Sequence, residues 1–335
     1  MRIGLIGTGR IGGFHAAALS RNREVGSLLV TDADPERATR LARRLGAVVA
    51  PSADEVLAWG VDAVVITTAT AAHAELITRA ARAGLPVFCE KPVAPDLAGT
   101  LAALAEVEAA GTVLQLGFQR RFDTGYTTAR EAVRAGKLGR LHTVRTVTSD
   151  PAPPPAAYLP LSGGLYRDCL VHDFDALRWI TGREVREVYA VGSDAGGEMF
   201  RAAGDVDTAA AVLTLDDGTL ATATATRCHG AGYDVRMELA GEWDQLAVGL
   251  DDRTPIASTE PSGPPPAERP WPGFLERFAA AYEAELAAFV DVVRGERANP
   301  CDGREALHAL RIAEACALSR THHRPVALTE IPGGP

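Results

Sequence analysis

The first 120 or so residues repeat one pattern, in which a short apolar run is followed by an alanine-rich amphipathic segment. Strands that are apolar on both faces and alternate with helices form parallel sheets covered by helices on both sides. The pattern therefore predicts a doubly wound parallel α/β domain. Its expected strands are residues 2–6, 26–32, 47–50, 63–67, 86–89 and 112–117, and its expected helices are residues 10–20, 35–45, 71–83, 95–110 and 123–135.

A different pattern begins after about residue 138, where apolar and polar residues alternate as they do in half-buried strands. The sequence Asp216-Asp217-Gly218-Thr219 is typical of a hairpin turn between two such strands. We expect a long helix at residues 274–293, because one apolar stripe recurs there, and we expect it to lie across the antiparallel sheet. The expected strands are residues 140–149, 185–193, 207–216, 219–228 and 233–240.

Residues 221–226, ATATAT, would present alanine on one face of a strand and threonine on the other. Such small side chains suit close packing against a helix or another subunit, and a solvated threonine face fits the pattern equally well. The length of 335 residues suits two domains, each large enough to bury its own core.

Composition excludes several classes of partner. The formal net charge of −9 argues against binding to nucleic acid or to an anionic membrane. No run of about 18 apolar residues is present, so the sequence predicts no membrane span. The five cysteines are scattered and include no CxxC pair, so we expect no disulfide framework and no metal site, and we expect a cytoplasmic protein.

A glycine-rich turn follows the first expected strand and opens the first expected helix. Gly7, Gly9 and Gly12 have the G-x-G-x-x-G spacing, which makes a tight turn, admits a pyrophosphate and lets helix and strand pack. Asp32 ends the second strand, where its carboxylate would accept hydrogen bonds from ribose hydroxyls and repel a 2′-phosphate. The spacing therefore predicts NAD rather than NADP; an aspartate that only caps the next helix is the alternative interpretation.

Glu90-Lys91-Pro92 ends the fifth expected strand. Ligands of doubly wound sheets bind outside the carboxyl ends of the strands, so Lys91 could hold a substrate hydroxyl and stabilise a developing alkoxide. A surface lysine in a loop is the alternative interpretation of the residue taken alone.

Asp168 and His172 lie four residues apart in SGGLYRDCLVHDFDALRWITG, a segment expected to be a glycine-rich loop that leads into a helix. One helical turn would place both side chains on the same face, where the carboxylate can orient the imidazole as a proton acceptor. A proton acceptor and a dinucleotide site on one chain indicate hydride transfer. A capping role for Asp168 remains open, whereas a metal site lacks a third ligand in register.

Together these features resemble the Gfo/Idh/MocA family of NAD(P)-dependent oxidoreductases over essentially the whole chain, and within it the inositol 2-dehydrogenases. The resemblance implies an NAD-binding Rossmann domain at residues 1–122. It also implies a substrate-binding and oligomerisation domain of α+β class at residues 123–335, with an open-faced, mostly antiparallel sheet and helices on one face. The segments that carry it are GTGRIGGFH (7–15), VTDADPERA (30–38), ITTATAAHAE (66–75), EKP (90–92), GFQRRFD (117–123) and SGGLYRDCLVHDFD (162–175).

The resemblance also implies roles for individual residues. His172 would be the general base, Asp168 would orient it and bind a hydroxyl, and Lys91 would anchor the reacting oxygen. The substrate would be a cyclic polyol or sugar, and the assembly a homodimer or homotetramer. Cofactor contacts are expected from Gly7, Gly9, Arg10, Ile11, Gly12, Asp32, Arg37, Thr68, His73, Glu90 and Gln119, and substrate contacts from Lys91, Arg120, Asp168, His172 and Tyr233.

The chain departs from the family pattern at several places that bear on the choice of substrate. Thr68-Ala69-Thr70 replaces the TPN-type turn of many relatives, and Ser149 stands where many inositol dehydrogenases have an arginine. The glycine-rich loop has two glycines rather than three, and residues 242–248 differ from the usual glycine-rich connection. The alternatives are a sugar dehydrogenase or ketosugar reductase of secondary metabolism, and a non-redox NAD-binding sugar sensor.

Overall fold

The computed structural model describes residues 1–333, which divide into two compact units. The first unit consists of residues 1–119 and 280–307, and the second contains residues 120–279 and the chain from residue 308 onward. The sequence predicted a single crossing of the chain after residue 122. In the structure the first crossing follows residue 119, and residues 280–307 then return to the first unit.

The first unit is built on a six-stranded parallel sheet of order β3-β2-β1-β4-β5-β6. The strand order reverses between β1 and β4, which is where doubly wound sheets bind ligands. The predicted parallel sheet is confirmed. The strands are β1 (Arg2–Ile6), β2 (Ser27–Thr31), β3 (Val48–Val49), β4 (Ala63–Ile66), β5 (Val87–Glu90) and β6 (Leu114–Gly117).

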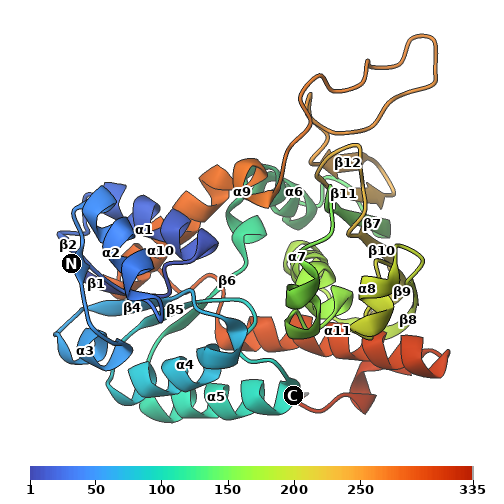
Figure 1. The fold of residues 1–335 in the computed structure, drawn as a ribbon. Helices are drawn as coiled ribbons and strands as arrows, with labels where there is room; N and C mark the ends of the chain where they lie inside the picture. Colours follow the sequence, from blue (N-terminus) through green and yellow to red (C-terminus); the bar gives the residue numbers. More distant parts are fainter. Residues whose placement is uncertain (334–335) are drawn as a thin grey trace. The chain divides into compact units, whose positions relative to one another are not determined.

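Helices cover both faces of this sheet, with α1, α2 and α10 along one face and α4 and α5 along the other (Figure 1). Each helix has a local reason to start or stop. Asp34 caps α2 through hydrogen bonds from two backbone N–H groups, and Gly46 ends α2 in the left-handed conformation. The helices are α1 (Arg10–Arg21), α2 (Pro35–Leu45), α3 (Ala53–Ala58), α4 (His73–Arg82), α5 (Leu97–Ala110) and α10 (Ala279–Val293).

The position of α10 corrects the sequence prediction. Residues 274–293 form two helices, α9 (Phe274–Arg277) and α10, and α10 does not lie across the antiparallel sheet. Leu286, Phe289 and Val290 of α10 are buried in the core of the first unit, in one cluster with residues of β1, β2, β4 and β5. Periodicity identified the apolar face of this helix, but it carries no information on which sheet the face covers.

The second unit is built on a seven-stranded sheet of order β12-β11-β7-β10-β9-β8-β13. Its pairs are antiparallel except for β7 and β10, which are parallel, so the predicted mostly antiparallel sheet is confirmed. The strands are β7 (Leu141–Ser149), β8 (Val185–Ser193), β9 (Thr208–Leu215), β10 (Leu220–Thr226), β11 (Asp234–Gly241), β12 (Gln245–Val248) and β13 (Val326–Ala327).

The two faces of this sheet differ. In β10 the alanines Ala221, Ala223 and Ala225 are buried, whereas Thr222 and Thr224 are exposed. The same exposed face carries Tyr189, Val191, Val212 and Leu220, each between 41% and 50% exposed. The helices of this unit are α6 (Thr124–Arg134), α7 (Val171–Thr181), α8 (Glu198–Ala202), α9 and the greater part of α11 (Gly303–His322).

No helix within residues 1–333 combines the length and hydropathy that a membrane crossing requires.

Candidate active site

The turn between β1 and α1 has the geometry that a dinucleotide requires. Gly7 has a φ of 99°, and a Cβ atom there would lie 2.6 Å from the carbonyl oxygen of Thr67. A side chain at Gly12 would collide with the backbone carbonyl of Gly7. Beside Gly9, by contrast, no atom lies within 4 Å of the position of a Cβ, so a phosphate can approach the backbone at the helix N-terminus. These residues therefore fit a bound dinucleotide.

Asp32 lies just beyond β2 with its carboxylate held by the glycine-rich turn. One oxygen accepts from the backbone N–H of Thr8 at 2.5 Å and from its hydroxyl at 2.9 Å, and the other accepts from the N–H of Asp34 at 2.9 Å. Burial alone would raise the pKa of Asp32, but these hydrogen bonds, with Arg37 nearby, lower it below its ordinary value. The carboxylate is therefore a fixed negative charge at neutral pH.

The other predicted residues of this turn are more exposed. Arg10 is exposed at the start of α1, and Ile11 is half-buried behind it. Arg37 has a side chain that is 48% exposed and a guanidinium nitrogen 3.4 Å from a carboxylate oxygen of Asp32.

His73 links the loops that follow β4 and β5. Its ring nitrogens lie 2.7 Å from the carbonyl oxygen of Pro92 and 3.1 Å from that of Thr68. Burial lowers the pKa of His73, against the opposing effect of these two carbonyls. Through this buried ring, the loop that carries Thr68 and the loop that carries Lys91 are fixed to each other. Lys91 itself is half-buried.

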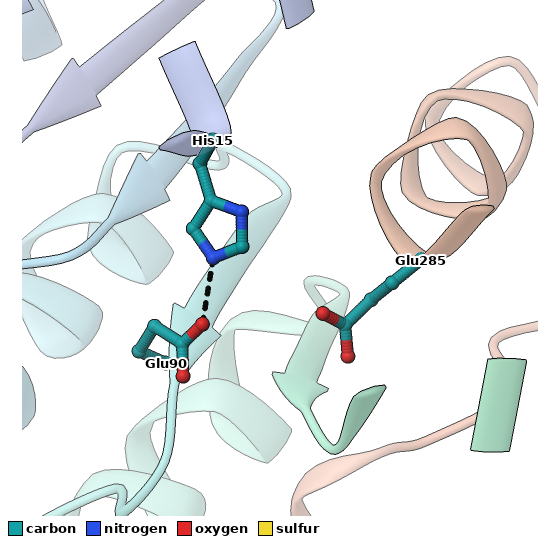
Figure 2. A group of neighbouring side chains, drawn as sticks. All are labelled: His15, Glu90 and Glu285. Atoms are coloured by element: carbon teal, nitrogen blue, oxygen red, sulfur yellow. Dashed lines mark hydrogen bonds and ion pairs between the residues drawn. The ribbon is translucent and has the colours of Figure 1, made fainter. Parts of the chain in front are cut away.

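Glu90 belongs to a group of three side chains in the first unit, in which His15 and Glu285 are buried and Glu90 is half-buried (Figure 2). His15 of α1 places Nε2 at 2.6 Å from a carboxylate oxygen of Glu90, and the buried carboxylate of Glu285 on α10 completes the group within 4.8 Å. A side chain at Gly117, which pairs with Glu90 across β5 and β6, would come within 3.0 Å of the Glu90 carboxylate. Because Gly117 has no side chain, the Glu90 carboxylate has room to reach His15.

The distance between His15 and Glu90 is that of a hydrogen bond rather than that of two ligands on one metal ion. Two ligand atoms on one tetrahedral Zn²⁺ lie about 3.3 Å apart, since each bond is about 2.0–2.1 Å long. The observed 2.6 Å is instead the length of a short hydrogen bond. The buried carboxylate of Glu285 lies beside this hydrogen-bonded pair.

Asp168 and His172 lie at the start of the helical segment that precedes and includes α7. The sequence predicted an α-helical turn between them, but residues Tyr166–Leu170 form a π-helix that runs into α7. Asp168 accepts a hydrogen bond from the Tyr158 hydroxyl at 3.1 Å on one oxygen and lies 3.2 Å from Arg227 on the other. His172 is half-buried. Single turns of π-helix often occur at functional sites, and hydrophobic periodicity does not reveal them.

Arg120 and Gln119 follow β6 and are almost completely buried. The Arg120 guanidinium donates to Asp173 at 2.7 Å and to the Thr148 hydroxyl at 2.8 Å, and the pKa of Tyr126 beside it is raised to about 12, chiefly by burial. Gln119 is 3% exposed, and its carbonyl oxygen has no hydrogen-bond donor among residues 1–333. The Gln119 side chain therefore carries an unsatisfied buried acceptor.

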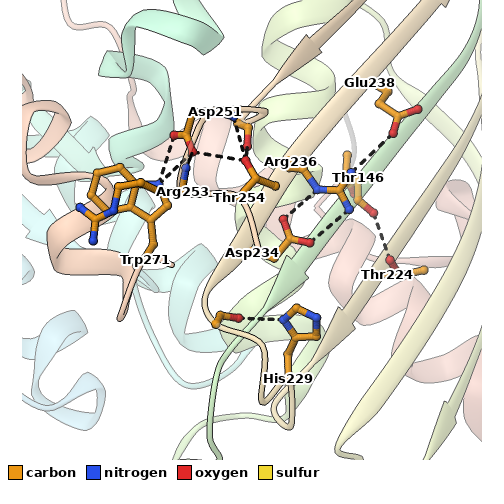
Figure 3. Close-up of polar contacts among 12 residues, drawn as sticks. Thr146, Thr224, His229, Asp234, Arg236, Glu238, Asp251, Arg253, Thr254 and Trp271 are labelled. Atoms are coloured by element: carbon orange, nitrogen blue, oxygen red, sulfur yellow. Dashed lines mark hydrogen bonds and ion pairs between the residues drawn. The ribbon is translucent and has the colours of Figure 1, made fainter. Parts of the chain in front are cut away.

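Tyr233 is buried directly before β11, and its backbone is fixed by the loop that follows β12. The N–H of Tyr233 donates to the carbonyl of Trp271 at 2.9 Å. The Trp271 ring is held in turn by a hydrogen bond to Asp251 at 3.1 Å and by the guanidinium of Arg253, 3.8 Å from the ring centroid (Figure 3). Burial raises the pKa of Tyr233, so its hydroxyl is a neutral donor and acceptor.

Sequence reasoning missed two residues that contact this machinery, Arg227 and Glu285. Arg227 follows a strand of small residues and Glu285 lies within the predicted helix 274–293, outside its apolar stripe, and neither belongs to a local motif. Only the fold brings them to Asp168 and to His15.

Comparison with known proteins assigns the chain to a family. Residues 1–118 match the family model described as "Oxidoreductase family, NAD-binding Rossmann fold", and residues 126–246 match the "GFO/IDH/MocA C-terminal domain". The chain belongs to the Gfo/Idh/MocA family of oxidoreductases. The predicted family, fold class, NAD cofactor and enzyme class are thereby confirmed.

Relatives within this family resemble the chain along nearly its full length. It is 40% identical to the myo-inositol dehydrogenase Hyg17 of Streptomyces leeuwenhoekii, over 96% of this chain and 98% of that protein. It is 36% identical to the myo-inositol 2-dehydrogenase of Thermotoga maritima, over 99% and 100%.

Solved structures of family members have the same fold. A probable dehydrogenase from Thermotoga maritima superposes with a TM-score of 0.92 at 35% identity, over 99% of this chain and 100% of that chain. The scyllo-inositol dehydrogenase of Lactobacillus casei with bound NAD(H) and scyllo-inositol superposes with a TM-score of 0.88 at 28% identity, over 98% and 99%.

Proposed function

We propose that this protein oxidises a secondary hydroxyl of a cyclic polyol, with an inositol as the first candidate, in a reaction that depends on NAD. The observation that carries the proposal is the full-length similarity to proteins named as inositol dehydrogenases, in a chain that keeps an acid and an imidazole four residues apart. A glycine-rich turn and a fixed Asp32 carboxylate suited to NAD support it.

In this proposal His172 takes the proton of the reacting hydroxyl, and Asp168 orients the imidazole and accepts a hydrogen bond from a substrate hydroxyl. Lys91 holds the reacting oxygen and stabilises the negative charge that develops on it. NAD, when bound, supplies the acceptor for the hydride.

The remaining predicted contacts fall into two groups. Thr68, His73, Glu90 and Gln119 are proposed to serve the nicotinamide side of the cofactor, His73 by fixing the loops that carry Thr68 and Pro92, and Gln119 through its buried carbonyl oxygen. Arg120 and Tyr233 are proposed to contact the polyol. Gly7, Gly9, Arg10, Ile11, Gly12, Asp32 and Arg37 are proposed to contact the rest of the dinucleotide.

We further propose assembly into a homodimer or homotetramer through the exposed face of the seven-stranded sheet, because that face exposes several large apolar side chains. A cytoplasmic location is proposed as well, because the cysteines within residues 1–333 form no disulfide, which suits a reducing compartment. Nothing within the described residues favours the sugar dehydrogenase or the non-redox sensor over the polyol dehydrogenase.

The direct test is a screen of inositols and aldoses with NAD, read as NADH absorbance. The proposal expects an inositol among the best substrates, with turnover on NAD exceeding that on NADP. Efficient oxidation of aldoses without oxidation of any inositol would replace it by the sugar dehydrogenase.

A further inference from the structure

Arg227 is a buried guanidinium that no step of the proposed reaction yet uses. It follows β10, and its side chain is 2% exposed. One nitrogen, Nη2, lies 3.2 Å from a carboxylate oxygen of Asp168, 3.7 Å from Asp205 and 3.5 Å from the hydroxyl of Ser162. Three separate segments of the second unit therefore meet at this one side chain.

The two carboxylates around Arg227 have different second partners. Asp205 accepts the backbone N–H of Leu165 at 3.0 Å, so it ties the guanidinium to the start of the π-helical segment. Asp168 accepts the hydroxyl of Tyr158 at 3.1 Å through Oδ1, while Oδ2 faces Arg227. Each oxygen of Asp168 thus takes a donor from a different segment, and both lone pairs of a carboxylate oxygen can accept.

A guanidinium this deeply buried is stable only beside negative charge, because an uncompensated buried charge is strongly destabilising. Burial by itself would lower the pKa of Arg227, but the surrounding groups, Asp168, Asp205 and Asp150 among them, raise it above its ordinary value. The cation in turn compensates the negative charge of the Asp168 carboxylate that it contacts.

We propose that Arg227 is a positioning residue of the reaction, which holds Asp168 as a carboxylate in one orientation so that it can only accept hydrogen bonds. This inference rests on the proposed function, in which Asp168 serves the substrate and His172. In this proposal Arg227 acts on the reaction only through Asp168. A fixed acceptor at this point favours a ligand that presents a hydroxyl donor.

A purely structural role for Arg227 predicts something different. If the guanidinium only stabilised the fold, its loss would lower stability and reduce the amount of active enzyme whatever residue stood at 168. If it acts through Asp168, its loss matters little once Asp168 has been replaced, because residues that act as a unit are not additive.

The experiment is a double-variant cycle of Arg227→Met and Asp168→Asn, with kcat and KM measured for NAD and for the inositol that the wild type oxidises fastest. Arg227→Lys, which keeps the positive charge but lacks the planar guanidinium and its several N–H donors, is measured beside Arg227→Met. It replaces Arg227→Met in the cycle if the methionine variant does not fold. Arg311→Met is the matched control, because Arg311 is also buried in the second unit but donates to backbone carbonyls near the C-terminus.

We expect Arg227→Met to lower kcat roughly 10- to 100-fold, the usual cost of removing an outer partner of an active-site group, with KM for NAD unchanged within about 2-fold. Arg227→Lys should retain more activity, Arg311→Met should keep kcat near wild type, and Arg227→Met should add less than about 3-fold on top of Asp168→Asn. Wild-type kcat in folded Arg227→Met, or losses that multiply in the double variant, would overturn the inference. Wild-type turnover in Asp168→Asn would instead remove the proposed role of Asp168, and the inference with it.

Discussion

Three carboxylates of this chain are held by three kinds of donor, and each arrangement suits a different task. Asp32 accepts from backbone N–H groups and a hydroxyl, which fixes a negative charge beside the glycine-rich turn. Glu90 shares a short hydrogen bond with His15, and Asp168 accepts from Tyr158 and lies against Arg227. The sequence identified all three acids but none of the protein donors that hold them.

Asp32→Ser should relax the preference for NAD. Serine removes the negative charge that repels a 2′-phosphate but keeps a hydroxyl near Thr8 and the ribose. The ratio of kcat/KM for NAD to that for NADP is therefore expected to fall by roughly 10-fold or more, in line with a loss of one charge contact. Better kcat/KM on NADP than on NAD in the wild type would contradict this account of Asp32.

His172→Ala should remove the pH dependence of oxidation. The base must be neutral to take a proton, so kcat/KM of the wild type should rise with pH across the range in which histidine titrates. The variant should lose that limb and about two to four decades of kcat. A pH–rate profile measured on NADH formation checks this, and an unchanged profile and rate in the variant would mean that another group is the base.

Local sequence suffices to predict the position of some of these residues but not the contacts of others. Asp32 could be placed because strand, turn and helix are contiguous, so that a fixed number of residues separates Gly12 from it. Arg227 could not be assigned to Asp168, nor Glu285 to His15, because strand pairing and helix packing bring them together across long stretches of chain.

At the scale of elements, α10 shows that hydrophobic periodicity predicts a helix but not the sheet against which it packs. The spacing of Leu286, Phe289 and Val293 predicts a helix with one apolar face, and the structure contains that helix. The face covers the parallel sheet of the first unit rather than the antiparallel sheet, because the chain crosses back after residue 279. Similarly, residues Tyr166–Leu170 were predicted as ordinary helix but form a π-helix.

Phe289→Ala should destabilise the first unit. Phe289 is 0% exposed and packs its ring 5.8 Å from that of Phe88 on β5, so the variant removes buried area and leaves a cavity. The free energy of unfolding should fall by about 3–5 kcal/mol in urea titrations followed by circular dichroism. Glu283→Ala, on the exposed side of α10, should cost less than about 1 kcal/mol. Equal effects of the two variants would show that α10 does not cover the sheet as described.

The whole molecule combines two compact units whose tasks are separable in the proposed function. The first unit holds the glycine-rich turn, Asp32 and Lys91, and the second holds Asp168, His172 and Arg227. The second also exposes one face of its sheet, with threonines and large apolar side chains side by side. Division of the chain into two domains could be predicted from length and pattern, but the return of residues 280–307 to the first unit could not.

Val212→Lys should weaken the proposed assembly. Val212 lies on β9 and is 50% exposed on the open face of the sheet, so a lysine there would place charge in a buried subunit contact. Light scattering after size exclusion should show a dimer or tetramer for the wild type and a smaller species for the variant. Val48→Lys, at an exposed position of β3 in the first unit, is the matched control and should keep the wild-type mass. A monomeric wild type would contradict the proposed assembly.

The chain contains two lysines, Lys91 and Lys137, and this permits the most direct test of the proposed reaction. Lys91→Met keeps most of the bulk of the side chain and removes the ammonium, while Lys137→Met makes the same change at an exposed position. NAD affinity and NADH formation with an inositol are measured for the wild type and both variants.

NAD affinity should be similar in all three, because the glycine-rich turn and the helix N-terminus hold the pyrophosphate. Turnover should fall by about two to three decades in Lys91→Met alone, since a donor that stabilises the transition state is lost. Wild-type turnover in a folded Lys91→Met, or a wild-type protein that binds NAD and an inositol without forming NADH, would contradict the account.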